Sequence, residues 1–286
     1  MTITICVCGA GTMGSGIAQV AAQSGFNTIL FDVNKTVLEN AKNNIKKNLD
    51  FLVNKAKISS AENTEIFQRI QFTNDIKDCF AQIIIEAIVE KASAKISLFN
   101  ELAQYNNEET IFATNTSSLS VSKIQKEIIF PQRVVGMHFF NPAYIMKLVE
   151  VVKGDQTDQE IANAIFNICK DMDKLPVICK DSPGFIVNRI ARHYYLESLK
   201  IVEEDIASFE DVDTILEASG FKMGPFKLMD LIGMDINLAV SKSIYDAFDK
   251  AERFTPSALQ EEKVKNGELG IKTGKGFYNY ENKIAQ

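Results

Sequence analysis

The stretch Gly9-Ala10-Gly11-Thr12-Met13-Gly14, written GAGTMG, decides how the chain begins to fold. It directly follows an apolar, β-rich run over residues 4–8, and it opens a segment in which apolar residues recur at helical spacing. A second apolar run, over residues 28–31, comes next. Glycines between a strand and a helix permit a tight turn and close packing, so this order predicts a β-α-β unit at the start of the chain.

Further apolar runs continue the pattern along the first half of the chain. They cover residues 83–85, 111–113, 134–135 and 177–178, and polar segments of helical character separate most of them. Strands that are buried on both faces read as continuous apolar runs, because helices cover both sides of a parallel sheet. The sequence therefore predicts an α/β fold in which the N-terminal part is a Rossmann-type, doubly wound, mostly parallel sheet.

Two segments set the domain organisation. Residues 35–57 are polar with helical period and longer than a crossover between strands needs, so we expect a helical hairpin near residues 35–68 that projects beyond the sheet. At Asp181-Ser182-Pro183-Gly184 the pattern changes, and the rest of the chain is helical in pattern with no convincing strand. We expect a nucleotide-binding domain over residues 1–182 and an all-α domain over residues 183–286.

The overall composition excludes several classes of function. The net charge is −6 and no run of Lys or Arg exceeds two residues, so nucleic acid is not an expected partner. No stretch approaches about 18 uninterrupted apolar residues, and we expect no membrane association and a cytoplasmic location. The five cysteines are odd in number and scattered, which argues against disulfides, and the sequence spacing predicts no metal site.

The glycine turn is also the first candidate binding site. Its G-x-G-x-x-G pattern is weak alone, but between a strand and a helix it favours a dinucleotide whose pyrophosphate meets the helix N-terminus. Asp32 ends the second strand, eighteen residues after Gly14, where its carboxylate can accept hydrogen bonds from a ribose. Because that carboxylate would repel a 2′-phosphate, NAD is favoured over NADP. A turn without a ligand is the alternative.

A second candidate site joins a histidine to a glutamate. His138, one of two histidines, lies in Gly136-Met137-His138-Phe139-Phe140-Asn141-Pro142, and Glu150 lies twelve residues later, inside the apolar run 148–152. A buried carboxylate needs a partner, and a Glu that fixes one ring nitrogen leaves the other able to act as a base. The alternatives are an inert, neutral ring and an edge strand with Glu150 in solvent.

Two polar positions add to this group. Asn115-Thr116-Ser117-Ser118 comes after the run 111–113, at the edge of a parallel sheet where ligands bind, although helix capping explains one of these hydroxyls equally well. Asn188 lies early in the first helix of the second domain, where it either reaches a ligand or is an ordinary exposed residue.

Six motifs in order resemble the 3-hydroxyacyl-CoA dehydrogenase family, nearly end to end. They are GAGTMG, NTSSLS at 115–120, GMHFFNP with MKLVEVV after it, DSPGFIVNR at 181–189, MGPFKLMDLIGMD at 223–235 and KTGKGFYNY at 272–280. The resemblance implies an oxidoreductase that interconverts (S)-3-hydroxyacyl-CoA and 3-ketoacyl-CoA with NAD, and the short-chain 3-hydroxybutyryl-CoA and acetoacetyl-CoA pair is our expectation. It also implies a homodimer formed through the C-terminal domain.

The resemblance further implies a role for each matching residue. His138 is the expected catalytic base and Glu150 its partner, while Ser117 and Asn188 contact the reacting part of the substrate. The expected cofactor-side residues are Gly9, Gly11, Thr12, Met13, Gly14, Asp32, Glu90, Lys95 and Ser117. Asn141 is a further expected substrate contact, and either Lys55 or Lys57 is expected to meet the CoA phosphates.

Two rival functions share parts of this pattern. A β-hydroxyacid dehydrogenase that acts on free acids would share the glycine turn but use a lysine base. A non-catalytic, crystallin-like dimer would bind NADH without turnover. The combination of His138, Glu150, Ser117 and Asn188 favours the acyl-CoA enzyme over both.

Overall fold

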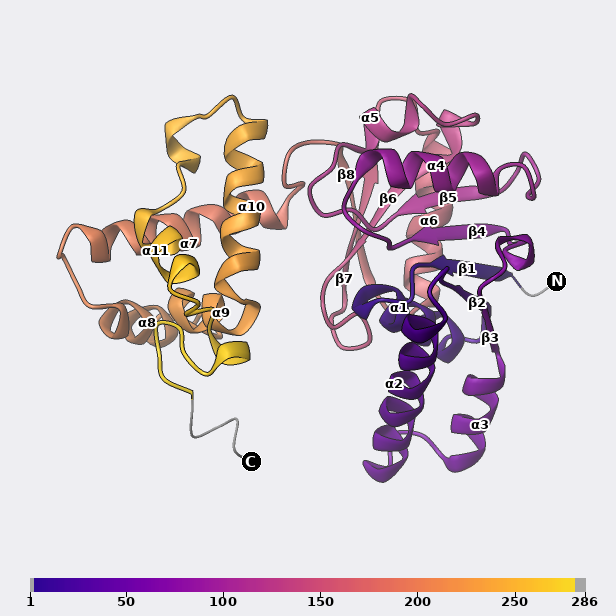
Figure 1. Ribbon diagram of the computed structural model, residues 1–286, viewed down its shortest axis with the longest axis horizontal. Helices are drawn as coiled ribbons and strands as arrows, with labels where there is room; N and C mark the ends of the chain where they lie inside the picture. Colours follow the sequence, from indigo (N-terminus) through magenta and orange to yellow (C-terminus); the bar gives the residue numbers. More distant parts are fainter. Residues whose placement is uncertain (1–2, 281–286) are drawn as a thin grey trace. The chain divides into compact units, whose positions relative to one another are not determined.

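The computed structural model describes residues 3–280 of the chain, which divide into two compact units. The N-terminal unit is Met1–Ser182 and the C-terminal unit is Pro183–Gln286. In Figure 1 the sheet and its helices belong to the first unit, and the second unit is built from helices.

The N-terminal unit is built on one eight-stranded sheet with the order β3-β2-β1-β4-β5-β6-β7-β8. Neighbouring strands are parallel except β6 and β7, which are antiparallel. The strands are β1 (Thr4–Cys8), β2 (Asn27–Phe31), β3 (Ile70–Thr73), β4 (Ile83–Glu86), β5 (Ile111–Thr114), β6 (Val134–Phe139), β7 (Leu148–Lys153) and β8 (Leu175–Lys180). The predicted fold class, a doubly wound and mostly parallel sheet, is confirmed.

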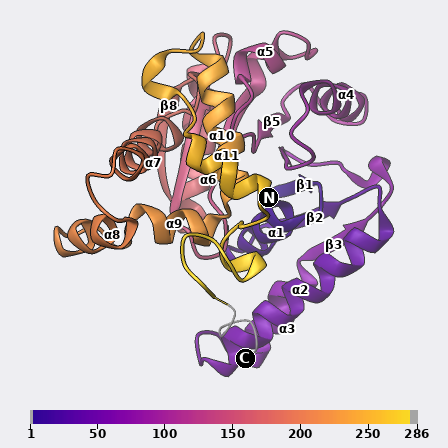
Figure 2. The same cartoon turned by 60° about the vertical axis from the view of Figure 1, so that its left-hand side comes forward.

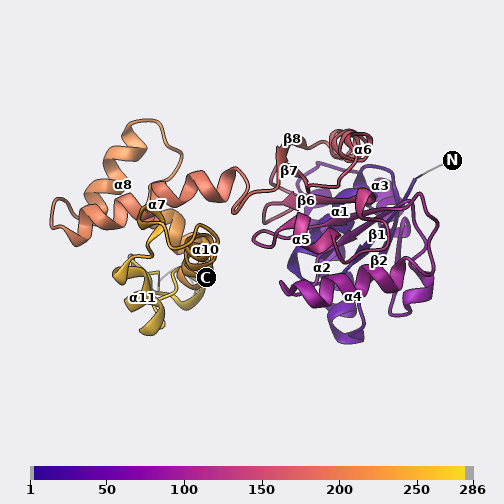
Figure 3. The same ribbon diagram turned by 90° about the horizontal axis from the view of Figure 1, so that it is seen from above.

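Helices cover both faces of this sheet. Figure 3 shows α4 and α6 on opposite sides of it. The helices of this unit are α1 (Thr12–Gln23), α2 (Lys35–Asn54), α3 (Ser60–Gln68), α4 (Ala92–Leu102), α5 (Val121–Gln125) and α6 (Gln159–Asp171). The main apolar core joins α1, α2 and α6 to one face of the sheet, where Val7, Ile85 and Val151 are fully buried. Side chains alternate along a strand, so the intervening residues face α4 and α5.

Helices α2 and α3 form a hairpin that extends beyond the sheet, and they lie side by side in Figures 1 and 2. Helix α2 ends at Asn54, three residues before the end of the predicted helical segment. Ala56 adopts a positive φ of 51°, and the N–H groups of Ala56 and Lys57 donate back to Val53 and Leu52. This is a Schellman stop built without glycine, so the usual sequence signal is missing.

Strand β3 is the element that the apolar runs did not predict. It has only four residues, and Gln71 at its second position is exposed. It pairs with β2 alone and forms one edge of the sheet. A short edge strand with one covered face lacks the continuous apolar run that marks the central strands.

The C-terminal unit is helical. Its helices are α7 (Val187–Glu203), α8 (Phe209–Ala218), α9 (Pro225–Ile232), α10 (Met234–Ala247) and α11 (Ala258–Lys265). Over residues 183–280 the structure contains no strand, only isolated bridges near residue 275. Two buried carboxylates tie the unit together: Asp213 accepts from the Phe226 N–H that opens α9, and Asp230 accepts from the Phe277 N–H near the chain end.

The glycine turn between β1 and α1 is packed without spare room at two of its three glycines. Gly9 has a φ of +101°, and a Cβ there would lie 2.6 Å from the carbonyl oxygen of Ala87. A Cβ on Gly14 would lie 1.7 Å from the carbonyl oxygen of Gly9. Gly11 differs, because a Cβ added there meets no atom within 4 Å. Gly9 and Gly14 are thus required by the fold, whereas Gly11 keeps a space open.

This contrast predicts opposite outcomes for two similar substitutions. Gly14→Ala is expected to destabilise the N-terminal unit by about 1–3 kcal/mol or more, because the new methyl group overlaps backbone that cannot move freely. Gly11→Ala is the matched control and is expected to cost less than about 1 kcal/mol, the scale of a lost N-cap preference. Thermal unfolding followed by circular dichroism measures both, and equal melting temperatures for the two variants would contradict the packing described.

Candidate active site

The predicted polar residues of the N-terminal unit gather at the edge of the sheet where the parallel strands end. Asp32 directly follows β2, the glycine turn follows β1, and Ser117 comes three residues after β5. His138 is the penultimate residue of β6. Strand order and direction thus bring these groups to one edge, which is where ligands bind in open α/β sheets.

Asp32 is fixed by the turn that it faces. Its Oδ2 accepts from the N–H of Ala10 at 2.8 Å, and its Oδ1 accepts from the N–H of Asn34 at 2.8 Å. Each carboxylate oxygen retains acceptor capacity beyond one bond, so ribose hydroxyls can still donate to it. The carboxylate is therefore held in place before any ligand arrives.

A hollow of about 520 Å³ lies beside the turn, between β2, the segment after β4, and α4. Phe31, Val37, Val89 and Leu98 give it apolar walls, and Gly11 and Asp32 lie on its border. The open space above Gly11 and the fixed carboxylate fit the phosphate and ribose of a dinucleotide, and the apolar walls fit its base. The residues present therefore suit NAD.

His138 and Glu150 form a buried pair. Nδ1 of the ring lies 2.7 Å from Oε2 of the carboxylate, and the two residues are only 5% and 1% exposed. A carboxylate accepts hydrogen bonds, so Nδ1 carries the shared hydrogen and the neutral tautomer is set. The ring of Phe140 packs against the imidazole with 4.6 Å between ring centroids.

The antiparallel pairing of β6 and β7 creates this contact. His138 is directly opposite Glu150 in the strand register, although twelve residues separate them in the chain. Strand β7 is not an edge strand, since β8 pairs along its other side. The alternative in which Glu150 faces solvent from a sheet edge is therefore excluded.

Glu90 organises the segment that contains Ser117. Its Oε1 accepts from the hydroxyls of Thr116 and Ser118, at 2.6 and 3.0 Å, and from the N–H groups of Ser117 and Ser118. Within the described residues the Ser117 hydroxyl itself makes no hydrogen bond. Capping of the next helix falls to Ser120, which accepts from the Lys123 N–H. Ser118 and Ser120 therefore stabilise the segment, whereas the Ser117 hydroxyl is available to a ligand.

Lys95 contacts the Glu90 carboxylate that organises this segment. Its ammonium group, 1% exposed, contacts Glu86 at 2.6 Å and Glu90 at 3.1 Å. Burial raises the pKa of Glu90, but the charge of Lys95 and the hydrogen bonds from Thr116 and Ser117 outweigh it and hold that pKa below its usual range. Glu90 is therefore a carboxylate at neutral pH, and Lys95 acts on the site through it.

The loop between β6 and β7 adds an apolar surface at the same edge. Asn141 is exposed near its start, and beyond it Tyr144, Ile145 and Met146 are 42%, 62% and 40% exposed. The buried Lys174 anchors the loop backbone, because its Nζ donates to the carbonyl oxygens of Ala143 and Met146. Burial, with the charge of Lys147, lowers the pKa of Lys174.

Three further predicted site residues come from other segments, namely the C-terminal unit and the turn after α2. Asn188 is the second residue of α7 in the C-terminal unit, and its side chain makes no hydrogen bond within residues 3–280. Lys55 and Lys57 are exposed in the turn after α2 rather than on the helix itself, which corrects the expectation that they lie on the projecting helix. No contact separates the two lysines as candidates.

Sequence reasoning missed Glu86 and Lys174. Glu86 is fully buried and accepts from the Thr114 hydroxyl at 2.7 Å, next to Lys95. Its signal was present, because a carboxylate ends the run Ile83-Ile84-Ile85-Glu86 just as Asp32 ends the apolar run before it. Lys174 offers no comparable signal, since it lies in a polar segment between a helix and a strand.

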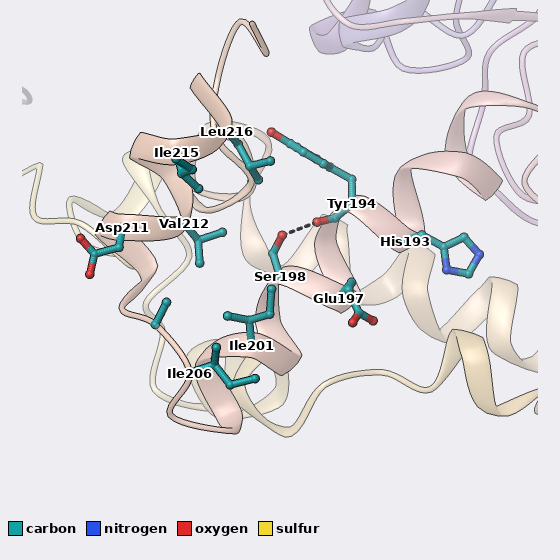
Figure 4. A pocket seen from close by; sticks show the side chains of 11 residues that line it. His193, Tyr194, Glu197, Ser198, Ile201, Ile206, Asp211, Val212, Ile215 and Leu216 are labelled. Carbon is teal, nitrogen blue, oxygen red and sulfur yellow. Dashed lines mark hydrogen bonds between the residues drawn. The ribbon is translucent and has the colours of Figure 1, made fainter. Parts of the chain in front are cut away.

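The C-terminal unit has a separate hollow of about 520 Å³ between α7 and α8. Figure 4 shows Ile201, Ile206 and Val212 around it, with the carboxylate of Asp211 and the ring of His193 at its margins. Ile206 and Ile215 are 67% and 64% exposed. This surface is apolar.

No helix in residues 3–280 combines the length and apolar character needed to cross a membrane. The model of the 3-hydroxyacyl-CoA dehydrogenase NAD-binding domain matches residues 4–182, and the model of the C-terminal domain of the same family matches residues 184–280.

Individual relatives agree with these matches. The chain is 42% identical to 3-hydroxyadipyl-CoA dehydrogenase of Escherichia coli over 97% of its own length but only 59% of that protein. It is 40% identical to a probable 3-hydroxybutyryl-CoA dehydrogenase of Deinococcus radiodurans, covering 96% of this chain and 99% of that one. The crystal structure of (S)-3-hydroxybutyryl-CoA dehydrogenase from Ralstonia eutropha superposes with a TM-score of 0.94 at 35% identity, over 98% and 99% of the two chains.

The matches to both domain models cover nearly all the described residues in the order found here, and the first of them covers the unit that has the glycine turn and the His138–Glu150 pair. The family match thus extends to the C-terminal unit and is not limited to the nucleotide-binding fold. The chain belongs to the NAD-dependent 3-hydroxyacyl-CoA dehydrogenase family.

Proposed function

We propose that this protein interconverts (S)-3-hydroxyacyl-CoA and 3-ketoacyl-CoA thioesters with NAD, and that 3-hydroxybutyryl-CoA and acetoacetyl-CoA are its substrates. The observation that carries the proposal is the buried His138–Glu150 pair at the ligand-binding edge of the sheet. A base set in one tautomer is what removal of a hydroxyl proton needs. Two relatives are named for 3-hydroxybutyryl-CoA and one for 3-hydroxyadipyl-CoA, which supports the thioester class.

In the proposed reaction, His138 takes the proton of the substrate 3-hydroxyl on Nε2. NAD, when bound, supplies the acceptor for the hydride that leaves C3. Glu150 stays ionised and stabilises the imidazolium, because the positive ring then lies 2.7 Å from a negative oxygen. In the reverse direction the imidazolium returns its proton to the 3-keto oxygen.

Three further side chains fix the geometry in this proposal. Ser117, placed by Glu90, offers its hydroxyl both to the substrate oxygen and to the nicotinamide side of the cofactor. Asn188 of the C-terminal unit and Asn141 of the loop after β6 contribute amide groups to the substrate. Such contacts act mainly by orientation, which converts a chance encounter into an aligned pair of reactants.

Cofactor choice and cell compartment are part of the proposal. Asp32, already oriented by two backbone donors, favours NAD over NADP because its charge would face a 2′-phosphate. Lys55 and Lys57 are both exposed and remain the candidates for the CoA phosphates. The five cysteines are all unpaired, which suits the reducing cytoplasm where we place the protein.

The rival functions are tested by one assay and one variant. The wild-type protein is expected to oxidise NADH with acetoacetyl-CoA and not with free acetoacetate. His138→Gln should lower turnover by at least about 10² to 10⁴-fold, the usual contribution of general acid–base catalysis, while NADH still binds. His193→Gln is the control, since that ring packs on Phe254 in the C-terminal unit. Near-normal turnover of His138→Gln would refute the role of the ring.

The Glu150 partnership makes a separate prediction about pH. Glu150→Gln keeps the size and a hydrogen-bonding group but removes the charge that stabilises the imidazolium. The acidic limb of the pH–rate profile for hydroxyacyl oxidation should move to lower pH, because the positive ring loses the negative oxygen that stabilises it, and turnover should fall. An unmoved limb in steady-state kinetics would mean that the carboxylate does not act on the ring.

We also propose that the protein is a homodimer joined through the C-terminal unit. The apolar hollow between α7 and α8, flanked by the exposed Ile206 and Ile215, is the surface that supports this. A second copy that covers these side chains would remove apolar area from water, the main favourable contribution in obligate interfaces.

A charge placed in this surface should separate the proposed dimer. Ile215→Asp is expected to shift the mass in sedimentation equilibrium from two chains to one, because a carboxylate would be buried without a partner. Ile145→Asp is the matched control: Ile145 is 62% exposed, against 64% for Ile215, but lies in the N-terminal unit. A wild-type protein that sediments as a monomer, or a dimer retained by Ile215→Asp, would contradict the proposal.

A further inference from the structure

Three cysteine sulfurs meet in the interior of the N-terminal unit. Cys6 and Cys8 project from the same face of β1, with 3.8 Å between their Sγ atoms. Cys79, far along the chain from both, directly follows the short 3₁₀ helix η1 (Ile76–Asp78). The three Sγ atoms all lie within 4.8 Å of one another, and each residue is 0% exposed.

The third sulfur is held in place by its surroundings. Asn106 donates from Nδ2 to the carbonyl oxygen of Cys79 at 2.9 Å and accepts from the N–H of Ala81 through Oδ1. On the other side of Cys79, the Thr73 hydroxyl donates to Asp78 of η1. The thiols of β1 and the thiol of Cys79 are thus positioned by two independent sets of contacts.

These distances match a thiolate metal site. A Zn–S bond is about 2.3 Å, so three sulfurs around one ion in a plane stand about 4.0 Å apart. The observed spacing therefore needs shifts of less than about 1 Å to reach that value. Thiolate sulfur selects soft ions, and a divalent ion offsets more of the thiolate charge than a monovalent one in a site without solvent.

We propose that Cys6, Cys8 and Cys79 form a binding site for one thiophilic divalent metal ion. Binding forms three metal–sulfur bonds and releases the thiol protons to solvent, with no change of oxidation state. The carbonyl oxygen of Asp75, 4.0 Å from the Cys79 sulfur, offers a fourth donor. The site is separate from the proposed catalytic pair, because β4 and β5 lie between β1 and β6 in the sheet.

The surface segment around η1 supplies a route for the ion. Of residues 74–80, only Cys79 is buried, and Phe80 beside it is 54% exposed. Cys8 immediately precedes Gly9, and its carbonyl oxygen accepts from the Ala87 N–H at 2.8 Å. A bound ion would therefore be linked through Cys8 to the strand end that supports the glycine turn.

Cadmium is the probe for this site. The full-length protein, reduced and metal-free, is titrated with Cd²⁺ without oxygen, while the sulfur-to-cadmium charge-transfer absorbance and the native mass are recorded. One ion per chain is expected, with an absorbance that saturates at one equivalent and is reversed by a chelator. Cys79→Ala should weaken binding at least tenfold, and Cys8→Ala should do the same from the other segment.

Two matched controls separate this site from general thiol binding. Cys169→Ala removes a buried thiol on α6, where burial raises the pKa to about 12, and Cys179→Ala removes the half-buried thiol of β8. Both should bind Cd²⁺ like the wild type. The proposal is overturned if the wild type shows no charge-transfer band at one equivalent while remaining folded, if Cys79→Ala binds normally, or if Cys169→Ala loses binding equally. The three thiols would then be packing groups alone.

Discussion

A buried carboxylate must have a partner, and the contact between Glu150 and His138 constrains the sheet around it. The 2.7 Å distance requires two strands in register, both interior, with the two side chains on one face. The reversal between β6 and β7 provides this arrangement, and β8 covers the far side of β7. A slip of one residue would turn Glu150 toward α6 and its apolar core, so the register is strongly specified.

The same face of the sheet holds further buried charges. Glu86 at the end of β4 lies beside Thr114 of β5, and Lys95 of α4 joins Glu86 to Glu90. The opposite face, against α1, α2 and α6, is the apolar core. The alternation of side chains along each strand thus puts the apolar core on one face of the sheet and these charged groups on the other. The backbone N–H of Ser117 donates to Glu90, and Glu90 in turn is paired with the buried Lys95.

The sequence predicted features that depend on local pattern. The central strands are continuous apolar runs, Asp32 and the glycine turn have fixed spacing, and the pairing of His138 with Glu150 was inferred from the cost of burying a carboxylate. Features that depend on distant contacts were missed. The Schellman stop at Ala56 lacks glycine, β3 is short and half exposed, and only the folded chain brings Cys79 to Cys6 and Cys8.

In the loop after β6, the anchoring of the backbone does not depend on the exposed side chains. Lys174 donates hydrogen bonds to its backbone, while the side chains of Tyr144, Ile145 and Met146 are exposed. Substitutions of these side chains would keep the hydrogen-bonding groups that anchor the loop backbone. In evolutionary terms, a lineage can vary the exposed surface of this loop by single mutations while its anchored backbone is inherited intact.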